Sequence, residues 1–393
     1  MRATQILILG AGAGGTMAAN MLDRKLDHDV EITVVDESPD HHYQPSYYLI
    51  PFGHMEAQAQ HRPVTSLLRT GVEFVQARVE GIDPEAGTVS TDAESLEYDY
   101  LITALGNRLA PEAVPGMQEA WERTDSVYPF YHYDAAIGLR DAVTDFDGGQ
   151  FLVTVPETPI KCGGAPLKMA MLADDYFRDI GVRDDVDIAV GKPAPTPFGT
   201  PPSPKAHYND KVEEIWAERD IEFLPEFEVS EIAYGEDRVI ATDGREVEYD
   251  LYAPVPPQYG RRALVEGSPL TGDGEYVTVD KHTLQHDDYD DVFAIGDNAN
   301  LPTSRTASAV RKQVHVLVNN LDATLAGRSP TAEYDGYTAC PLLTEEGKAM
   351  IAEFNYEEPI AAPVETRSNW VLDINVIPPM YWNVWMRGYD PVP

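Results

Sequence analysis

Residues 5–15 decide the fold of the chain: Gln-Ile-Leu-Ile-Leu-Gly-Ala-Gly-Ala-Gly-Gly. The apolar run over residues 5–9 predicts a short buried strand, and the small residues after it predict a helix to about Arg24. A second apolar run, residues 30–35, predicts a neighbouring strand that Asp36 closes. This strand–helix–strand order at the start of the chain is typical of an α/β fold built on a parallel sheet.

The glycines between the first strand and the helix predict a phosphate-binding turn. Gly10, Gly12 and Gly15 have the spacing of a dinucleotide-binding loop, and Gly14 lies within it. Glycine permits a tight turn and a close approach of backbone to a pyrophosphate, which the helix N-terminus attracts. Asp36 stands 21 residues after Gly15 and suits a ribose hydroxyl. The alternative, a glycine turn without a ligand, leaves this complete context unexplained.

A second motif lies much further along the chain. Residues 292–297, Val-Phe-Ala-Ile-Gly-Asp, predict a strand that ends in Gly296 and Asp297. The carboxylate can hold a ribityl hydroxyl, and the helix predicted over residues 306–325, which carries Lys312, can point its N-terminus at a flavin ring. Alone, this stretch reads as an ordinary strand-end turn. Its pairing with the first motif favours a cofactor site.

Together the two motifs resemble FAD-dependent flavoproteins with two dinucleotide-binding domains. Gly106, after the strand predicted over residues 99–105, fits the turn where such chains leave the FAD domain. The resemblance implies an α/β fold with two Rossmann-like domains of the FAD/NAD-linked reductase type and a C-terminal segment. The expected division is an FAD-binding domain over residues 1–107 and 246–330, a second Rossmann-like domain over 108–245, and the C-terminal segment over 331–393.

The second domain lacks the glycine pattern that a nicotinamide cofactor would need. After the strand predicted over residues 151–155, the chain reads Pro-Glu-Thr-Pro-Ile-Lys-Cys-Gly-Gly-Ala-Pro, and Cys162 occupies this loop. The next strand, ending near Gly191, has no acid for a ribose. We therefore expect no NAD site here. A stiff stretch with six prolines, residues 193–204, is either a linker or a lid.

Several segments, in order along the chain, resemble the sulfide:quinone oxidoreductase family. They are Tyr43-Gln44-Pro45, Lys161 to Pro166 with Lys168, Pro256-Pro257, Val292 to Asp297, and Tyr337 to Pro341. The family's two redox cysteines correspond to Cys162 and Cys340, and Pro45 joins the glycines among the FAD-binding residues. Lys161, next to Cys162, either favours its thiolate or faces solvent. The chain has no third cysteine, so the resemblance implies non-covalent FAD.

The resemblance implies oxidation of sulfide to persulfide or polysulfide sulfur, with the electrons passing through the flavin to a membrane quinone. Three alternatives stay open. One is a sulfide dehydrogenase flavoprotein, like that of flavocytochrome c, which uses a cytochrome acceptor. Another is a type II NADH:quinone dehydrogenase, which the missing second glycine pattern disfavours. The third is a flavin-binding redox sensor or carrier without turnover. No group of residues has metal-ligand spacing, and His41, His42, His282 and His286 are weak candidates for proton relay.

The chain is strongly acidic, with 66 Asp and Glu against 29 Lys and Arg and a net charge of -37. The spread of this acidic excess along the chain predicts a halophilic protein, because salt screens the repulsion between its negative charges. Docking to a basic partner is the alternative. Phosphate contacts need basic patches, so nucleic acid is not an expected partner. Neither a signal peptide nor an apolar run of about 18 residues is found. We expect a location in the cytoplasm or on the cytoplasmic side of the cell membrane, with homo-oligomerisation left open.

The C-terminal segment carries three of the chain's five tryptophans, at positions 370, 382 and 385. Tryptophan and tyrosine favour the membrane–water interface, so the segment is expected to attach the protein peripherally near its quinone. The alternative is that these rings pack against the domains. Pro378 and Pro379 are expected to break any helix here.

Overall fold

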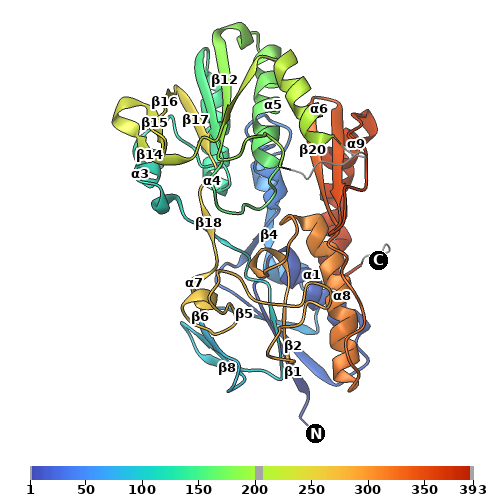
Figure 1. The fold of residues 1–393 in the computed structure, drawn as a ribbon. Helices are drawn as coiled ribbons and strands as arrows, with labels where there is room; N and C mark the ends of the chain where they lie inside the picture. The colour runs from blue at the N-terminus through green and yellow to red at the C-terminus, as the bar shows by residue number, and fades with distance from the viewer. Residues whose placement is uncertain (1, 200–206, 390–393) are drawn as a thin grey trace.

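The computed structural model describes residues 2–199 and 207–389, which form two lobes joined along one side by the C-terminal segment (Figure 1). The first lobe contains a parallel sheet in the order β19-β9-β1-β2-β5. Apolar residues predominate in its strands because both faces of the sheet are covered. They are β1 (Thr4–Leu9), β2 (Val30–Asp36), β5 (Val72–Gln76), β9 (Tyr100–Thr103) and β19 (Val292–Ala294).

Helices cover one face of the first sheet. A small antiparallel sheet contributes to the hydrophobic core on its other face. Helix α1 (Ala13–Lys25) packs beside α8 (Ala307–Leu325) in one core. The second core includes the strands β6 (Val79–Asp83), β7 (Thr88–Thr91) and β8 (Ser95–Glu97). Shorter elements of this lobe are β3 (Asp40–His42), β4 (His61–Pro63), α2 (Val64–Leu67) and α7 (Arg262–Val265).

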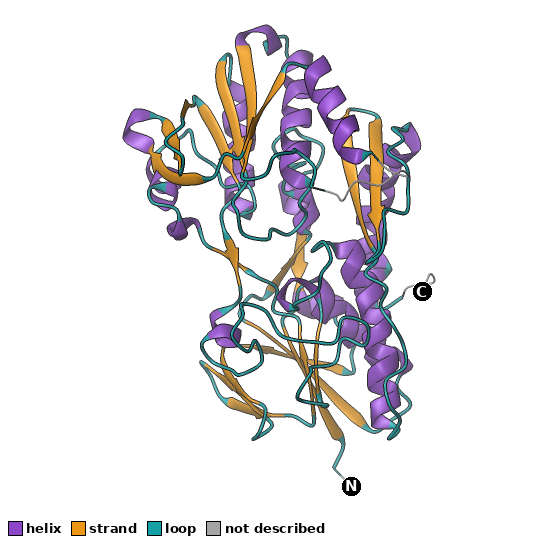
Figure 2. Ribbon diagram, viewed as in Figure 1, coloured by secondary structure: helices purple, strands orange, loops and turns teal. Residues whose placement is uncertain are grey.

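The second lobe repeats the parallel design with the strand order β13-β12-β11-β17. These strands are β11 (Gly149–Thr154), β12 (Val186–Lys192), β13 (Ile221–Pro225) and β17 (Leu251–Pro254). The helices of this lobe are α3 (Met117–Arg123), α4 (Tyr133–Asp145), α5 (Ala165–Asp179) and α6 (Tyr208–Glu218). A small sheet adds β14 (Val229–Ala233), β15 (Arg238–Ala241) and β16 (Glu246–Glu248). Figure 2 shows the helices flanking the strands of this lobe. The two parallel sheets confirm the predicted fold class.

The chain crosses between the lobes on two paired strands, β10 (Arg108–Leu109) and β18 (Gln258–Tyr259). The sequence predicts that the chain returns to the first domain at residue 246. In the structure, β17 pairs with β11 from Phe151↔Leu251 onward, so the second sheet extends past that residue. We therefore propose β18 as the point of return.

The C-terminal segment links both lobes. Its hairpin, β20 (Thr338–Glu345) and β21 (Lys348–Phe354), shares a core with α5. It then runs as α9 (Arg367–Val371), a π-helical turn η7 (Leu372–Val376) and α10 (Ile377–Asn383). The predicted break at Pro378 and Pro379 is wrong. Both prolines lie in the first turn of α10, directly after the π-turn, where proline is tolerated.

The proline-rich stretch 193–204 extends into residues 200–206, which lie outside the described residues. In its described part, Phe198 packs against Tyr208 and Phe354. Whether this stretch is a linker or a lid stays a prediction.

His41 ties the tail to the glycine loop of the first lobe. Its Nδ1 lies 2.7 Å from the carbonyl oxygen of Ala11, and its Nε2 lies 2.6 Å from the hydroxyl of Tyr381. A carbonyl only accepts, so Nδ1 carries the proton and Nε2 accepts from tyrosine. The other three histidines singled out from the sequence also make structural contacts: His42 stacks on His61, His282 contacts the carbonyl of Tyr334, and His286 contacts that of Leu270.

His41 is expected to make the fold sensitive to acid. Burial, beside the weaker effects of Ala11 and His42, lowers the pKa of His41 from 6.5 to about 4. The unfolded chain therefore binds a proton here first, so this stability is present above pH 6.5 and is lost as pH falls toward 4. The loss amounts to ~2 kcal/mol between pH 6.5 and about 5. Urea unfolding of wild type and His41→Gln at both pH values measures the difference, and an equal pH dependence in the two proteins would contradict the assignment.

Candidate functional site

The fold brings together the two cysteines of the chain. Cys162 lies in the loop between β11 and α5, and Cys340 lies in β20. Their sulfur atoms are 3.8 Å apart, although the residues are 178 positions apart in the sequence. Cys340 is 8% exposed and Cys162 is partly exposed. A disulfide bond is ~2.05 Å long, so a small side-chain movement could join the two sulfurs.

The backbone of Cys162 is held in an unusual conformation. Its φ is +47°, a left-handed value that a non-glycine residue adopts only when its surroundings impose it. The amide of Cys162 donates to the carbonyl of Arg305 at 2.8 Å. Its own carbonyl accepts from the amide of Ala165 at 2.8 Å and from the hydroxyl of Tyr131 at 3.1 Å. These contacts hold the backbone of Cys162 in this conformation.

Gly164 lets the second sulfur approach this loop. A Cβ atom at position 164 would lie 2.7 Å from Sγ of Cys340 and 2.6 Å from a methyl group of Leu342. We therefore expect Gly164→Ala to push the hairpin away and to slow oxidation of the pair by at least ~10-fold, since a 1 Å misplacement costs up to about 10²-fold. Thiol titration after timed exposure to oxidised glutathione measures this rate. Gly163→Ala is the matched control, because a Cβ there meets no described atom within 4 Å.

Lys168 supplies positive charge to the pair. Its Nζ lies 3.6 Å from the sulfur of Cys162 and 3.9 Å from that of Cys340. The hydrogen bond from Cys340, opposed by burial and aided by Lys168, lowers the pKa of Cys162 to about 6. The hydrogen bond to Cys162 and burial raise the pKa of Cys340. The arrangement therefore favours a thiolate at Cys162 and a thiol at Cys340.

Lys161 is half-buried, and no hydrogen bond from its ammonium to either sulfur is found among the described residues. Burial lowers its pKa to about 8, with the charge of Asp297 opposing the change and that of Arg261 adding to it. The cation beside the sulfurs comes from one turn inside α5.

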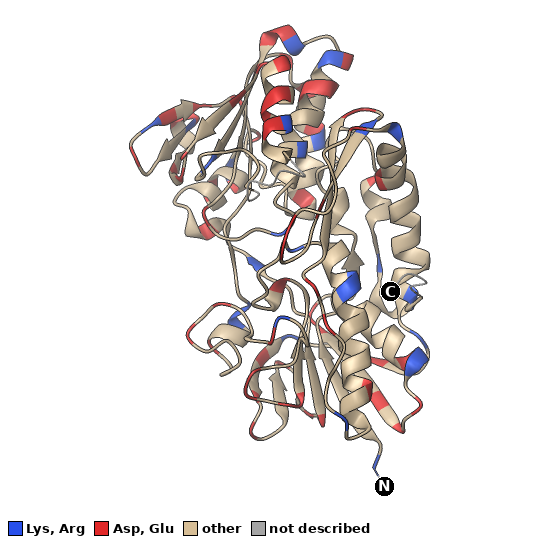
Figure 3. Cartoon of the chain, turned by 45° about the vertical axis from the view of Figure 1, so that its right-hand side comes forward, with Lys and Arg blue, Asp and Glu red and all other residues tan. Residues whose placement is uncertain are grey.

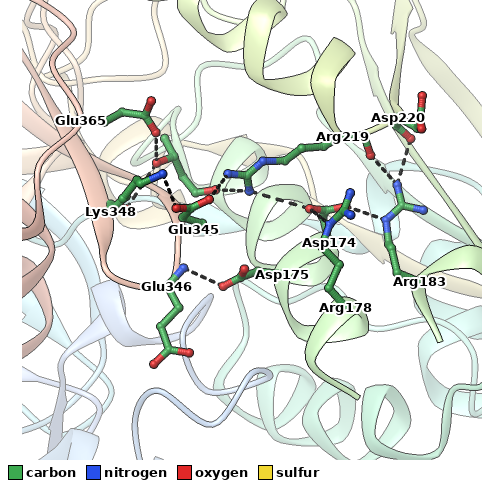
Figure 4. Close-up of polar contacts among 11 residues, drawn as sticks. Asp174, Asp175, Arg178, Arg183, Arg219, Asp220, Glu345, Glu346, Lys348 and Glu365 are labelled. Atoms are coloured by element: carbon green, nitrogen blue, oxygen red, sulfur yellow. Dashed lines mark hydrogen bonds and ion pairs between the residues drawn. The ribbon is translucent and has the colours of Figure 1, made fainter. Parts of the chain in front are cut away.

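A charged cluster positions the hairpin that carries Cys340 (Figure 4). Asp174 on α5, 1% exposed, accepts from Arg183 at 2.6 Å and from Arg178 at 2.9 Å. Arg219 lies 3.8 Å from Asp174 and reaches Glu345 of β20 at 2.8 Å. The buried Asp174 carboxylate requires pairing, and Arg219, which lies between it and Glu345, links the hairpin to α5.

The predicted glycine loop makes a tight turn that packs closely against the first sheet. Gly10 has φ +101°, and a Cβ there would lie 2.4 Å from the carbonyl oxygen of Ala104. A Cβ on Gly15 would lie 1.8 Å from the carbonyl oxygen of Gly10, and one on Gly14 would lie 3.2 Å from Ile295. Gly12, in contrast, faces open space among the described residues and caps α1 without a side chain. The helix N-terminus is therefore accessible to an anion.

The predicted acids and the remaining glycines lie around the same edge of the first sheet. Asp36 ends β2, and its carboxylate accepts from the amides of Ala11 at 2.6 Å and Ser38 at 2.9 Å. Gly106 has φ +68° and open space beside it among the described residues. Gly296 and Asp297 follow β19, which pairs with β9. Burial raises the pKa of Asp297, against the effects of Lys161 and Arg305.

A small cavity is lined by Gly296 and Asp297, by Arg305 and Thr306 directly before α8, and by Gln313 within α8. The adjacent buried Asn298 has a side-chain oxygen without a hydrogen-bond partner in the described structure. The open space beside Gly12 and Gly106, the accessible N-terminus of α1 and the Asn298 oxygen without a partner in the described structure fit an FAD molecule. Lys312 does not line this cavity, and its Nζ lies 5.7 Å from the centre of the Tyr337 ring. Pro45 lies in the turn η1 (Gln44–Ser46).

Comparison with known proteins gives consistent matches. The family of pyridine nucleotide-disulphide oxidoreductases matches residues 4–136. The mitochondrial sulfide:quinone oxidoreductase of Mus musculus is 32% identical over 405 residues, which cover 98% of this chain and 87% of that protein. Its counterpart in Dictyostelium discoideum is 33% identical over 397 residues, covering 98% and 86%. The solved structure of the sulfide:quinone oxidoreductase from Aquifex aeolicus has a TM-score of 0.85 at 19% identity, covering 98% of this chain and 92% of that one.

Proposed function

Because this chain belongs to the sulfide:quinone oxidoreductase family, we propose that it oxidises sulfide to persulfide or polysulfide sulfur and delivers the electrons to a membrane quinone. The observation that carries the proposal is the contact between Cys162 and Cys340 at 3.8 Å, with the ammonium of Lys168 beside both sulfurs. Two free thiols with a shared cation are suited to thiol–disulfide chemistry.

The chemistry begins from a Cys162–Cys340 bridge. Hydrosulfide attacks the sulfur of Cys340, the bond between the two cysteines breaks, and its electron pair stays on Cys162 as a thiolate. Cys340 then carries a persulfide. The assignment follows from electrostatics, because Cys162 has the lowered pKa and therefore makes the better leaving group. Lys168 stabilises the thiolate, and the left-handed loop holds its sulfur in place.

The chain binds a flavin, as its family implies, and we propose that this flavin is FAD held without a covalent bond. Gly10, Gly12, Asp36 and Asp297 would hold it, with further contacts from the first turn of α8. When bound, the flavin supplies a two-electron acceptor that quinone can reoxidise. The two cysteines of the chain face each other, which leaves no cysteine for a thioether to the cofactor. Acid precipitation should therefore release all of the flavin into the supernatant.

The loop after β11 argues against the NADH-dependent alternative. It holds Cys162 where a nicotinamide-binding glycine turn would stand, and β12 ends in Lys192 instead of an acid. Anaerobic titration tests the proposal. Sulfide should bleach the flavin absorbance within the enzyme, and a soluble quinone should restore it, whereas NADH should leave it unchanged. Bleaching by NADH would overturn the proposal in favour of a type II NADH:quinone dehydrogenase. If a cytochrome restored the absorbance and quinone did not, the sulfide dehydrogenase alternative would be favoured instead.

We also propose that the tail attaches the protein to the cytoplasmic surface of the cell membrane. Trp370, Tyr381 and Trp382 are buried, so these rings pack the lobes as the alternative prediction had it. The aliphatic residues of the π-turn region face outward, with Val371 41%, Leu372 36% and Val376 37% exposed. Among the described residues, no helix combines the length and apolarity that crossing a bilayer requires.

The charge pattern supports this attachment. Acidic residues are spread along the chain in both lobes (Figure 3), but residues 366–388 contain a single acid, Asp373, which is buried. An otherwise acidic protein thus presents an apolar helix that an anionic lipid surface does not repel.

Replacing Val371, Leu372 and Val376 together by serine should abolish co-flotation with phosphatidylglycerol-containing vesicles, because each substitution removes apolar area from the interface. Density-gradient flotation measures the bound fraction. The double variant Ile360→Ser and Val364→Ser is the matched control, since these residues are also exposed aliphatics but lie outside the helix. Equal flotation of the triple variant and wild type would contradict the proposed contact.

A further inference from the structure

A buried carboxyl lies close to the cysteine pair, on the tail. Asp373 lies in the π-helical turn η7 and is 7% exposed. The hydroxyl of Tyr48 donates to its carboxylate at 3.3 Å. The Tyr48 ring in turn lies beneath the ammonium of Lys168, whose Nζ is 3.9 Å from the ring centre. Three distant segments of the chain thus bring Asp373 into the same buried cluster as Cys162 and Cys340.

The charges in this cluster do not balance in both states of the pair. The ionisable groups that face Asp373 are Lys168 from α5, Tyr43 and Tyr48 from the segment around η1, and the two cysteines. Burial raises the pKa values of both tyrosines, so they stay neutral. When the two cysteines are bridged, the positive charge of Lys168 and the negative charge of an ionised Asp373 cancel. Reduction adds the Cys162 thiolate and leaves one cation facing two buried anions, which is unfavourable.

We propose that Asp373 is a proton-exchanging residue of the redox pair, ionised when the pair is bridged and protonated when Cys162 becomes a thiolate. This inference rests on the proposed function of the pair. The location in a π-turn agrees with it, because such turns recur at functional sites. Asp373 itself is 7% exposed and the adjacent Leu372 is exposed, so Asp373 lies close to the protein surface. Burial raises the pKa of Asp373 to about 6. The charge of Lys168 opposes this increase, and that of Cys162 adds to it.

The exchange with glutathione shows the balance of the step. Two glutathione thiols are oxidised to one disulfide, and the bond between Cys162 and Cys340 breaks. Of the two protons released by glutathione, one remains on Cys340 as a thiol and the other goes to Asp373, while Cys162 stays a thiolate. No net proton is released to solvent. Without Asp373, the same reaction releases one proton.

The test is the pH dependence of this equilibrium in the holoenzyme. In wild type, the ratio of reduced to bridged pair at fixed glutathione should be nearly constant around pH 6, where Asp373 exchanges its proton. In Asp373→Asn, one proton is released for each pair reduced, so the ratio should rise by up to about tenfold per pH unit. Quenching with acid, alkylation and mass determination give the ratio without any measurement of turnover. Equal slopes in the two proteins would overturn the inference.

Two further variants separate this role from a structural one. Tyr48→Phe keeps the ring beneath Lys168 but removes a donor that favours the ionised carboxylate, so the flat region should extend to higher pH. An unmoved flat region there would also overturn the inference, even if Asp373→Asn failed to fold. Asp291→Asn is the matched control, because Asp291 also has a pKa raised by burial but lies beside β19, and it should behave like wild type. If the wild-type pair never exchanges with glutathione, the proposed function itself fails instead.

Discussion

Replacing Cys340 by serine is expected to abolish reduction of the flavin by sulfide, with a loss on the order of 10³-fold or more. A hydroxyl cannot form the bridge that hydrosulfide attacks, and Sγ of Cys340 is the partner that lies 3.8 Å from Cys162. Cys162→Ser should lose as much, because the two sulfurs act as one unit, and the double variant should be no worse than either single variant. Anaerobic stopped-flow measurement of flavin bleaching by sulfide gives the rates.

Serine is nearly the size of cysteine, so both variants should fold and keep their flavin. Reduction by dithionite provides the control, because it needs no cysteine and should proceed at the wild-type rate. A Cys340→Ser enzyme that is reduced by sulfide within tenfold of the wild-type rate, with normal flavin content, would refute the bridge as the site of attack.

The local parts of the fold could be predicted from the sequence because their signals are local. The glycine turn, the strands on either side of α1 and the Gly296–Asp297 turn each occupy a short stretch with a distinct physical requirement. The contact between Cys162 and Cys340 has no such signal. It depends on α5 packing against a hairpin far along the chain, and only the resemblance to a family pointed to it.

The sequence predictions for Lys161 and for the tail prolines also depended on three-dimensional context that short stretches of sequence do not carry. Lys161 is adjacent to Cys162 in sequence, but adjacency along the chain does not by itself bring two side chains together. Lys168, six residues further on in α5, has its ammonium near both sulfurs. The prolines of the tail seemed to end a helix, yet they follow a π-turn that places them where helices begin. Asp373 did leave a trace in the sequence, as the single acid in residues 366–388 of an acidic chain.

The charge of Lys168 accounts for a large part of the expected reactivity of Cys162. Its Nζ approaches this sulfur to 3.6 Å inside a buried cluster, where an ion pair is screened far less than at the surface. The hydrogen bond from Cys340 and the charge of Lys168 overcome burial and keep the pKa of Cys162 at about 6, so the sulfur is mostly a thiolate at neutral pH. Removing the cation leaves burial opposed only by the hydrogen bonds from Cys340 and from the amide of Ala165.

Lys168→Met is therefore expected to raise the pKa of Cys162 and to slow its alkylation by iodoacetamide at pH 7 by at least ~10-fold, with a similar loss in sulfide-driven flavin reduction. Methionine retains most of the buried volume, so the packing of α5 should survive. The pH profile of alkylation of the reduced enzyme measures the shift. Lys192→Met is the matched control, because Lys192 is also partly buried in the second lobe but donates to the carbonyl of Pro197. An alkylation profile in Lys168→Met that coincides with that of Lys192→Met would show that the ammonium does not control the thiolate.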